Sequence, residues 1–380
     1  MDYFSRSLEV HKEHRGKLEI ASKVPLETLD DLSISYTPGV AEPCRLLAKD
    51  PAAAYDYTIK GNLVAVVTDG SAVLGLGNIG GLAGLPVMEG KALLFKHFAD
   101  VDAFPICLAT QEVDEIVATV KAIAPTFGGI NLEDISAPRC FEVEKRLREE
   151  LDIPVFHDDQ HGTAIVTLAG LLNALKVVNK KIKDIRIVVN GAGAAGIAVS
   201  KLLIKAGVSD LVMCDSKGVI YEGRENLDPY KEKMAAITNP RGVKGDLAEA
   251  MKDADVFIGV SVPECVTAEM VSSMADKAIV FAMSNPTPEI MPNEAQKGGA
   301  LVMATGRSDL PNQINNALVF PGIFRGLLDG RATAINPEML LKSAHALAVL
   351  VADPKADKII PQISEKGVSE AVAEAVKSCC

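Results

Sequence analysis

Two pairs of adjacent carboxylates offer the hard oxygen atoms that Mg²⁺ and Mn²⁺ prefer. Glu133 and Asp134 follow the apolar segment GGINL, and Asp158 and Asp159 come just after the apolar run PVF. Each pair lies at the end of an expected strand, so the two pairs can converge in one cleft. Adjacent residues of an extended strand point to opposite faces, and both members of a pair can bind one ion only if the backbone turns there.

His157 and His161 flank the second pair and raise zinc as an alternative metal. Neither a metal-type cysteine spacing nor an H-E-x-x-H helix supports zinc, so we favour Mg²⁺ or Mn²⁺. From spacing alone, a set of solvated loop carboxylates with no metal stays open.

Lys91 lies in the apolar stretch PVMEGKALLF, which we expect to open a helix. Burial or a nearby metal cation lowers the pKa of a lysine, which can then act as a base. Lys96 need not share the face of Lys91, and we expect it to be solvated. Tyr36 precedes a Thr-Pro-Gly turn, where a side chain can face a cleft, although an ordinary core or surface tyrosine is the alternative.

Two segments match the dinucleotide-binding pattern G-x-G-x-x-G. After the first, Gly75–Gly80, comes GLAGLP, whose glycine and proline are poor openings for a helix, so we expect a tight loop that shapes a pocket. The second follows an expected strand and opens an expected helix, whose free N–H groups can hold a pyrophosphate. Its residues are Gly191, Ala192, Gly193, Ala194, Ala195 and Gly196.

Asp215 ends the next expected strand, 24 residues after Gly191. A carboxylate there can bind a ribose 2′-hydroxyl and repels a 2′-phosphate, which predicts NAD as the cofactor. Lys217 can offset that preference, so NADP stays possible.

Strand and helix patterns alternate along the chain, which predicts an α/β fold. We expect an N-terminal α/β catalytic domain over residues 1–160 and a Rossmann-type doubly wound parallel sheet over residues 161–340. The remaining helices, over residues 341–380, are expected to pack back on the first domain. The expected strands cover 63–70, 104–109, 128–135, 185–190, 210–215, 255–260, 278–283 and 300–305, and a long apolar-faced helix covers 163–181.

Composition bounds the possible partners and location. The net charge of −11 argues against nucleic acid, whose phosphates demand lysine and arginine. The longest uninterrupted apolar run, ALAVLVA, is far below the ~20 residues of a membrane span, and the N-terminus does not resemble a signal peptide. Seven scattered cysteines favour reduced thiols. We therefore expect a cytoplasmic protein that binds neither nucleic acid nor membrane.

Taken together, several segments resemble blocks of the malic enzyme family, in its shorter, microbial form and in family order. They run from Tyr36 to about Thr333 and comprise YTPGVAEPC, VVTDGSAVLGLGNIG, LPVMEGKALLFK, GGINLEDI, FHDDQHGTA, VVNGAGAAG, MSNPTPEI, ATGRSDLPNQINNALVFPG and FRGLLDGRAT. The resemblance implies oxidative decarboxylation of (S)-malate to pyruvate and CO₂, with reduction of NAD(P) and a divalent metal. It also implies a homodimer or a higher homo-oligomer.

The resemblance assigns roles to individual residues. By it, Tyr36 is the general acid, Lys91 the general base, and Asp158 a carboxylate near the lysine; Glu133, Asp134 and Asp159 bind the metal; Asn285 and Asn316 are amides near the substrate and the nicotinamide ribose. Asp158 favours a charged lysine, whereas burial and the metal disfavour it, and the sequence does not decide between them.

Ala72 stands where longer family members carry a substrate-binding arginine. Ser71, backbone N–H groups and the metal are the candidate replacements. The rival enzymatic readings are a malolactic or oxaloacetate-decarboxylating activity on the same scaffold and, less favoured, an amino-acid dehydrogenase. The non-enzymatic rival is a regulatory protein that senses dinucleotides, which predicts cofactor binding without turnover.

Overall fold

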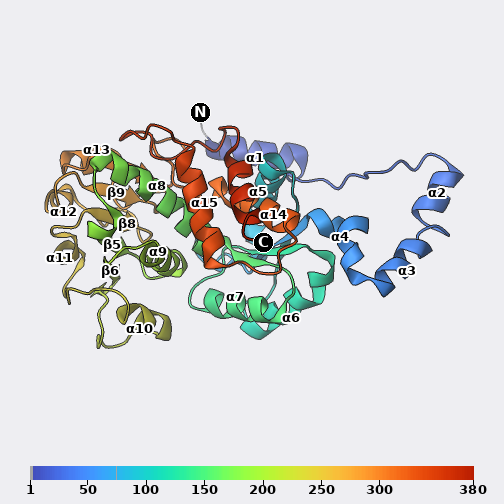
Figure 1. Ribbon diagram of the computed structural model, residues 1–380, viewed down its shortest axis with the longest axis horizontal. Helices are drawn as coiled ribbons and strands as arrows, with labels where there is room; N and C mark the ends of the chain where they lie inside the picture. The colour runs from blue at the N-terminus through green and yellow to red at the C-terminus, as the bar shows by residue number, and fades with distance from the viewer. Residues whose placement is uncertain (1–2, 74) are drawn as a thin grey trace.

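Two α/β units organise the chain in the computed structural model, which describes residues 3–73 and 75–380 (Figure 1). Each unit has a parallel sheet with connecting helices. Helix α8 (Thr163–Val178) lies between them and directly follows the helical turn that carries the second acidic pair. The predicted α/β class is confirmed.

The first sheet has the strand order β2-β1-β3-β4, and all its neighbours are parallel. Its strands are β1 (Leu63–Thr68), β2 (Asp102–Cys107), β3 (Gly129–Leu132) and β4 (Val155–His157). The connecting helices are α5 (Gly81–Ala99), α6 (Val113–Ile123) and α7 (Arg139–Glu150), with a short 3₁₀ turn η3 (Ala124–Thr126). Because parallel strands end at the same edge, the residues after β3 and β4 are brought together.

The second sheet has the order β10-β9-β8-β5-β6-β7, with β7 antiparallel at the edge. Its strands are β5 (Arg186–Asn190), β6 (Asp210–Asp215), β7 (Gly218–Val219), β8 (Val256–Gly259), β9 (Ile279–Ala282) and β10 (Val302–Thr305). Its helices are α9 (Ala194–Lys205), α10 (Pro229–Ala235), α11 (Leu247–Met251), α12 (Ala268–Ser272) and α13 (Pro292–Lys297), after the turn η5 (Ile182–Asp184). After β5 the chain adds β6 and β7 on one side and then β8, β9 and β10 on the other, so the strand order reverses between β5 and β8. Sheets of this kind bind nucleotides at such a switch point.

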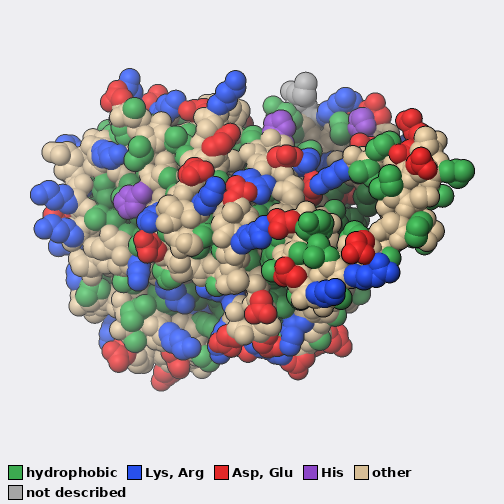
Figure 2. Space-filling view, turned by 45° about the vertical axis from the view of Figure 1, so that its right-hand side comes forward, with side chains coloured by type: hydrophobic (Ala, Val, Ile, Leu, Met, Phe, Trp, Pro, Cys, Tyr) green, Lys and Arg blue, Asp and Glu red, His purple; other side chains and the backbone are tan. Residues whose placement is uncertain are grey.

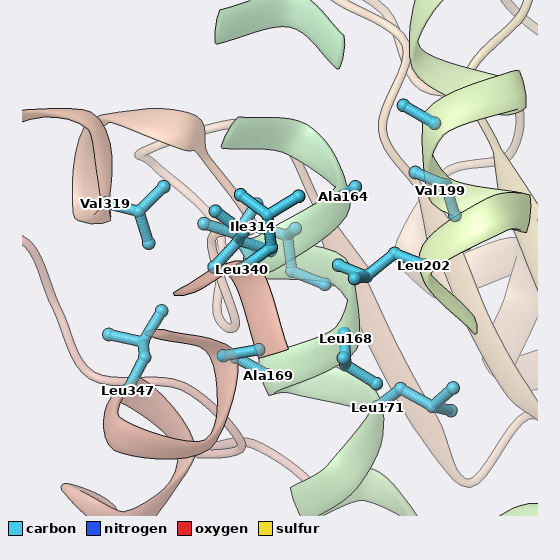
Figure 3. Packing of buried hydrophobic residues seen from close by; sticks show 14 of the residues in the cluster. Ala164, Leu168, Ala169, Leu171, Val199, Leu202, Ile314, Val319, Leu340 and Leu347 are labelled. Carbon is cyan, nitrogen blue, oxygen red and sulfur yellow. The ribbon is translucent and has the colours of Figure 1, made fainter. Parts of the chain in front are cut away.

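Helix α8 is buried along almost its whole length, and its main contacts are with α9 of the second unit and with the C-terminal helix α15 (Pro337–Val349). Figure 3 shows Leu168 and Leu171 of α8 facing Leu202 of α9, with Leu340 and Leu347 on another side. By length and composition alone, the helical segment Asp158–Val178 could cross a membrane, but 72% of its most apolar window is buried inside the fold. It serves here as the core helix.

The C-terminal helices pack back on the first unit and on α8, as predicted. They are α14 (Phe320–Asp329), α15 (Pro337–Val349) and α16 (Val368–Lys377), preceded by η6 (Asn316–Leu318). Phe320 and Phe324 of α14 place their rings edge-on at 4.7 and 5.3 Å from the ring of Phe95 in α5. The predicted domain boundaries at 160 and 340 remain predictions.

Part of the N-terminal region, with its second and third helices, projects away from both sheets (Figure 1). The region comprises α1 (Tyr3–His14), α2 (Leu29–Ser35), α3 (Ala41–Lys49), η1 (Pro51–Ala53), α4 (Ala54–Tyr57) and η2 (Ile59–Asn62). We call residues 24–52, which include α2 and α3, the arm. No residue of the arm is buried.

Helix α5 begins at Gly81, directly after the first glycine-rich loop, and includes Pro86. The expectation that this segment is a poor helix opening was therefore wrong, and Lys91 lies mid-helix. Close packing explains the glycine, because a Cβ on Gly81 would lie 2.3 Å from the carbonyl oxygen of Leu108. Burial of Met88 and Phe95 stabilises the helix against the weak local propensity.

Candidate active site

Three carboxylates meet at the ends of β3 and β4. Oxygen atoms of Glu133, Asp134 and Asp159 all lie within 4.8 Å of one another. The backbone N–H of Asp134 donates to Asp159 Oδ2 at 2.8 Å. Asp134 Oδ2 is buried without a hydrogen-bond partner in the described part of the chain. An oxygen-only donor set with an orphaned buried oxygen fits a hard divalent cation.

The backbone turns at both acidic pairs, which allows them to converge. Asp134 has a φ of 54°, in the left-handed region. The alternation of an extended strand is broken there, so Glu133 and Asp134 both contribute to the cluster. Asp158 and Asp159 begin a helical turn, η4 (Asp158–Gly162), which leads into α8.

Burial makes this cluster electrostatically unfavourable without a counter-charge. It raises the pKa of Asp134 to about 8, with a further contribution from the Asp159 carboxylate. The pKa of Glu133 is raised well above its ordinary value, also chiefly by burial. Crowded buried carboxylates with raised pKa values are groups that a dication would stabilise in the charged form.

Lys91 connects the cluster to Asp158 and Asn316. Its Nζ lies 2.5 Å from Asp158 Oδ2, 3.0 Å from Glu133 Oε1 and 3.4 Å from Asn316 Oδ1. Burial lowers the pKa of Lys91, but the carboxylates of Asp158 and Glu133 outweigh it, so the net pKa is raised. The sequence did not decide whether Asp158 or burial controls the charge of Lys91. In the structure without a cation, the carboxylates outweigh burial and favour the charged lysine.

A cavity of about 570 Å³ opens beside the cluster. Asp134, Asp159, Asn285, Asn316 and Ala72 line it, together with the glycine-rich loop at Gly75 and Gly77. Ala195 of the second glycine-rich segment lines it as well. None of its described lining residues is lysine or arginine.

A second cavity, of about 940 Å³, lies over the switch point between β5 and β8. Gly191, Ala192, Gly193 and Asp215 line it, and Ser261 and Val262 line both cavities. A dinucleotide laid across the switch point can therefore reach from Asp215 to the acidic cluster.

Each glycine of the second glycine-rich loop is required for a different structural reason. Gly191 has a φ of 115°, and a Cβ there would lie 2.4 Å from the carbonyl oxygen of Val260. A Cβ on Gly196 would lie 1.8 Å from the Gly191 carbonyl oxygen, so Gly196 permits close packing of α9. Gly193 has open space above it and begins α9 without a side-chain cap, which leaves N–H groups free for a phosphate.

Comparison with known proteins places the chain in a family. The model of the malic enzyme N-terminal domain matches residues 15–148, and that of the malic enzyme NAD-binding domain matches residues 160–380. The bifunctional malic/malolactic enzyme of Bacillus subtilis is 60% identical over 99% of this chain and 92% of its own length. The chain belongs to the malic enzyme family. The resemblance predicted from the sequence is thereby confirmed.

Solved malic enzymes share the whole fold. The crystal structure of the NAD-dependent malic enzyme of Thermotoga maritima superposes with a TM-score of 0.95 at 50% identity, covering 98% of both chains. The NADP-dependent malic enzyme of Escherichia coli is 50% identical over 93% of this chain, which spans only 47% of that longer protein.

Asp215, the residue on which the cofactor prediction depends, is already paired in this malic enzyme. Arg224 NH2 lies 2.5 Å and Lys231 Nζ 3.1 Å from Asp215 Oδ2. Burial raises the pKa of Asp215, but these two cations and the backbone N–H of Lys217 outweigh it and lower it to about 2. Sequence reasoning missed Arg224 and Lys231, because no spacing rule points to them. The carboxylate is thus less repulsive to a 2′-phosphate than it looked alone.

Two predicted site residues do not face the cavity of their own chain. The Ser71 hydroxyl donates to Asp69 Oδ1 at 2.5 Å and accepts the Ser136 N–H at 2.9 Å, so it is engaged within the protein. Tyr36 ends α2 on the arm and is 65% exposed, whereas α5, which carries Lys91, lies in the body (Figure 1). Of the other predicted residues, five line the substrate cavity and four line the second cavity: Asp134, Asp159, Ala195, Asn285 and Asn316, and Gly191, Ala192, Gly193 and Asp215. Lys91 and Asp158 lie against the acidic cluster that includes Glu133.

Proposed function

We propose that this malic enzyme oxidatively decarboxylates (S)-malate to pyruvate and CO₂ while reducing a nicotinamide cofactor. One observation carries the proposal: two carboxylates of the buried oxygen cluster and Ala195 of the dinucleotide loop line one cavity, and the buried Lys91 lies against the same cluster. Glu133, Asp134 and Asp159 would hold Mg²⁺ or Mn²⁺. That cation would supply positive charge to the substrate oxygens, and the nicotinamide would supply the hydride acceptor.

Lys91 is placed to take the proton of the substrate hydroxyl. Lys91 can act as a base only when the carboxylates of Glu133 and its neighbours interact with a bound cation, because their negative charges otherwise raise the pKa of Lys91. Asp158, 2.5 Å away, can then receive the proton, since burial raises the pKa of Asp158 to about 6. The amides of Asn285 and Asn316 are positioned to orient the substrate. Decarboxylation then needs an acid for C3, the role that the family resemblance gives to Tyr36.

Without an arginine at Ala72, the substrate carboxylates need other partners. The asparagine amides and the cation site supply them in this proposal. NAD is the favoured cofactor because Asp215 keeps its negative charge, which repels a 2′-phosphate. NADP is accepted less well but not excluded, because Arg224 and Lys231 partly offset that charge. All seven cysteines are free, which fits the proposed cytoplasmic location.

The test is one assay: malate with NAD or NADP, with and without Mn²⁺, following reduced nicotinamide and CO₂ together. Both should appear in equal amounts and only with the metal. A protein that binds the dinucleotide but turns over no malate in the presence of Mn²⁺ would contradict the proposal.

A malolactic activity is the second candidate, because the Bacillus subtilis relative is named for both reactions. It predicts lactate and CO₂ with no net reduced nicotinamide. Measuring lactate and pyruvate in the same samples separates the two.

A further inference from the structure

Glu289 is a buried acid that the proposed mechanism does not use. It belongs to the segment MSNPTPEI, which directly follows β9, and it is completely buried. Acidic side chains on the face shown in Figure 2 lie among lysines and arginines, whereas the described partners of the Glu289 carboxylate are uncharged donors. Burial of a carboxylate is costly unless hydrogen bonds compensate, so these partners define what Glu289 stabilises.

Three hydrogen bonds hold the Glu289 carboxylate, and they come from two different loops. The N–H and the hydroxyl of Ser261 donate to Oε1 at 2.8 and 3.2 Å. The N–H of Ser284 donates to Oε2 at 3.0 Å. Ser261 lies two residues after the end of β8, and Ser284 lies two residues after the end of β9. Glu289 therefore joins the carboxyl ends of two neighbouring strands.

The same network reaches a third strand. Asn190, the last residue of β5, donates from Nδ2 to the Ser261 hydroxyl at 2.8 Å. Strands β5, β8 and β9 are adjacent in the sheet, and the switch point lies between β5 and β8. The N–H of Val266 donates to the backbone carbonyl oxygen of Glu289 at 3.0 Å. Both ends of the loop 261–266 are thus bound to Glu289.

The carboxylate fills its place closely, and its chemistry is specific. A Cβ on Gly259 would lie 2.5 Å from Glu289 Cδ and 2.7 and 2.8 Å from its two oxygen atoms. An ionised carboxylate offers only acceptors to these donors, whereas a glutamine would turn an NH₂ group towards one of the two N–H groups. Burial raises the pKa of Glu289 on balance, although the hydrogen bonds from Ser261 and Ser284 oppose the shift.

The loops that Glu289 joins form the wall where the two cavities meet. Ser261 lines both cavities, and Ser284 and Asn285 line the substrate cavity beside the acidic cluster. A dinucleotide whose adenosine ribose lies at Asp215 must place its nicotinamide half past Ser261, towards Asn285. Because Glu289 is completely buried, it acts on that half only through these loops.

We propose that Glu289 is a positioning residue for hydride transfer: it fixes Ser261 and Asn285, and thereby the place of the nicotinamide ring beside the substrate. The hydride transfer itself rests on the proposed function, whereas the shaping of the nicotinamide subsite rests only on the dinucleotide site. A misplacement of reacting groups by about 1 Å can slow a reaction about 100-fold. An acid with a merely structural role would change the stability of the fold, or the affinity for every part of the dinucleotide equally.

The deciding experiment compares NADH with ADP-ribose, which lacks the nicotinamide ring. Wild-type protein and Glu289→Gln are titrated with each compound by calorimetry, without metal or malate. In Glu289→Gln the affinity for NADH should fall about tenfold, because a misplaced donor displaces Ser284 and Asn285, while the affinity for ADP-ribose stays within about twofold. Glu264→Gln makes the same change at an exposed residue of the same loop and should bind both compounds as the wild type does.

Equal losses of affinity for NADH and ADP-ribose, or no loss for either, would overturn the proposal. Thermal unfolding is recorded for each variant, so that every titration is made on folded protein. If Glu289→Gln does not fold, Gly259→Ala takes its place, since the added Cβ displaces the same carboxylate without removing its charge. Gly259→Ala should also weaken NADH and spare ADP-ribose.

Turnover separates this role from the proposed function. With malate and Mn²⁺ at saturating cofactor, Glu289→Gln should lose about 10- to 100-fold in kcat, and Glu264→Gln should lose nothing. A kcat in Glu289→Gln equal to that of the control would refute a role in hydride transfer. If the wild type itself turns over no malate, the proposed function is refuted, and the comparison of NADH with ADP-ribose still decides whether Glu289 shapes the nicotinamide subsite.

Discussion

Two glycines of the dinucleotide loop should respond oppositely to the same added methyl group. At Gly193 the backbone is extended, with φ −92° and ψ −158°, and nothing lies within 4 Å of an added Cβ. Gly193→Ala should therefore fold with a stability within about 1 kcal/mol of wild type, the loss coming only from a poorer helix cap. The methyl group fills space that the pyrophosphate needs, so dinucleotide affinity should fall about 10- to 100-fold.

At Gly196 the methyl group meets backbone instead of open space. The added Cβ would lie 1.8 Å from the carbonyl oxygen of Gly191, against an ordinary contact of at least 3.4 Å, so the loop and α9 must separate by about 1.6 Å. Overpacking of this kind costs about 2–4 kcal/mol. At roughly 2 °C for each kcal/mol, Gly196→Ala should lower Tm by about 4–8 °C.

The pair is tested by thermal unfolding without cofactor and by calorimetric titration with NAD and NADP. We expect Gly193→Ala to bind the dinucleotide more weakly with little change in Tm, and Gly196→Ala to have a lowered Tm. Wild-type affinity in Gly193→Ala would refute the placement of the pyrophosphate over this loop. A Gly196→Ala protein as stable as wild type would refute the packing argument.

Three further predictions concern charge. Lys91→Ala should abolish malate oxidation yet leave dinucleotide affinity unchanged by fluorescence titration; near-wild-type turnover would remove Lys91 from the mechanism. The pKa of Asp134 is raised to about 8, so this carboxyl must lose its proton before it can bind a cation. In calorimetry, Mn²⁺ affinity should therefore rise by up to about tenfold per pH unit below pH 8 and level off above it. An affinity that does not change with pH would contradict this. Asp215→Ser removes the carboxylate that Arg224 and Lys231 share and should shift the ratio of kcat/KM about tenfold or more towards NADP, whereas a ratio shifted towards NAD would show that Asp215 does not face the ribose.

Much of the fold could be predicted because apolar runs and turn residues coincide with its elements. The strand predicted over 210–215 is β6 to the residue, and the others differ only at their ends. The start of helix α5, before Pro86, was not predicted from local signals, because the helix is stabilised by burial of Met88 and Phe95 rather than by the propensity of its first turn. Tertiary packing overrode Gly84 and Pro86, and no local pattern reports tertiary packing.

The candidate site could be predicted in membership but not in geometry. The left-handed turn at Asp134, which brings both members of its pair to one cluster, is invisible in the letters ED. The partners of Asp215 come from a loop and a helix 9 and 16 residues further on, and a spacing rule cannot find them. The exposure of Tyr36 likewise depends on where the arm goes, which its turn motif does not specify.

The central helix α8 has a practical consequence for how this enzyme can be divided. Residues of α8 contact α9 and α15 and belong to the buried cluster that also contains strand residues of both sheets, so this shared core is incomplete without it. A fragment cut near residue 160 would expose either the face that α8 covers or α8 itself, a segment apolar enough to enter a bilayer when unshielded. The two halves should therefore unfold in a single cooperative transition, and expression of either half alone should yield aggregated or membrane-associated material.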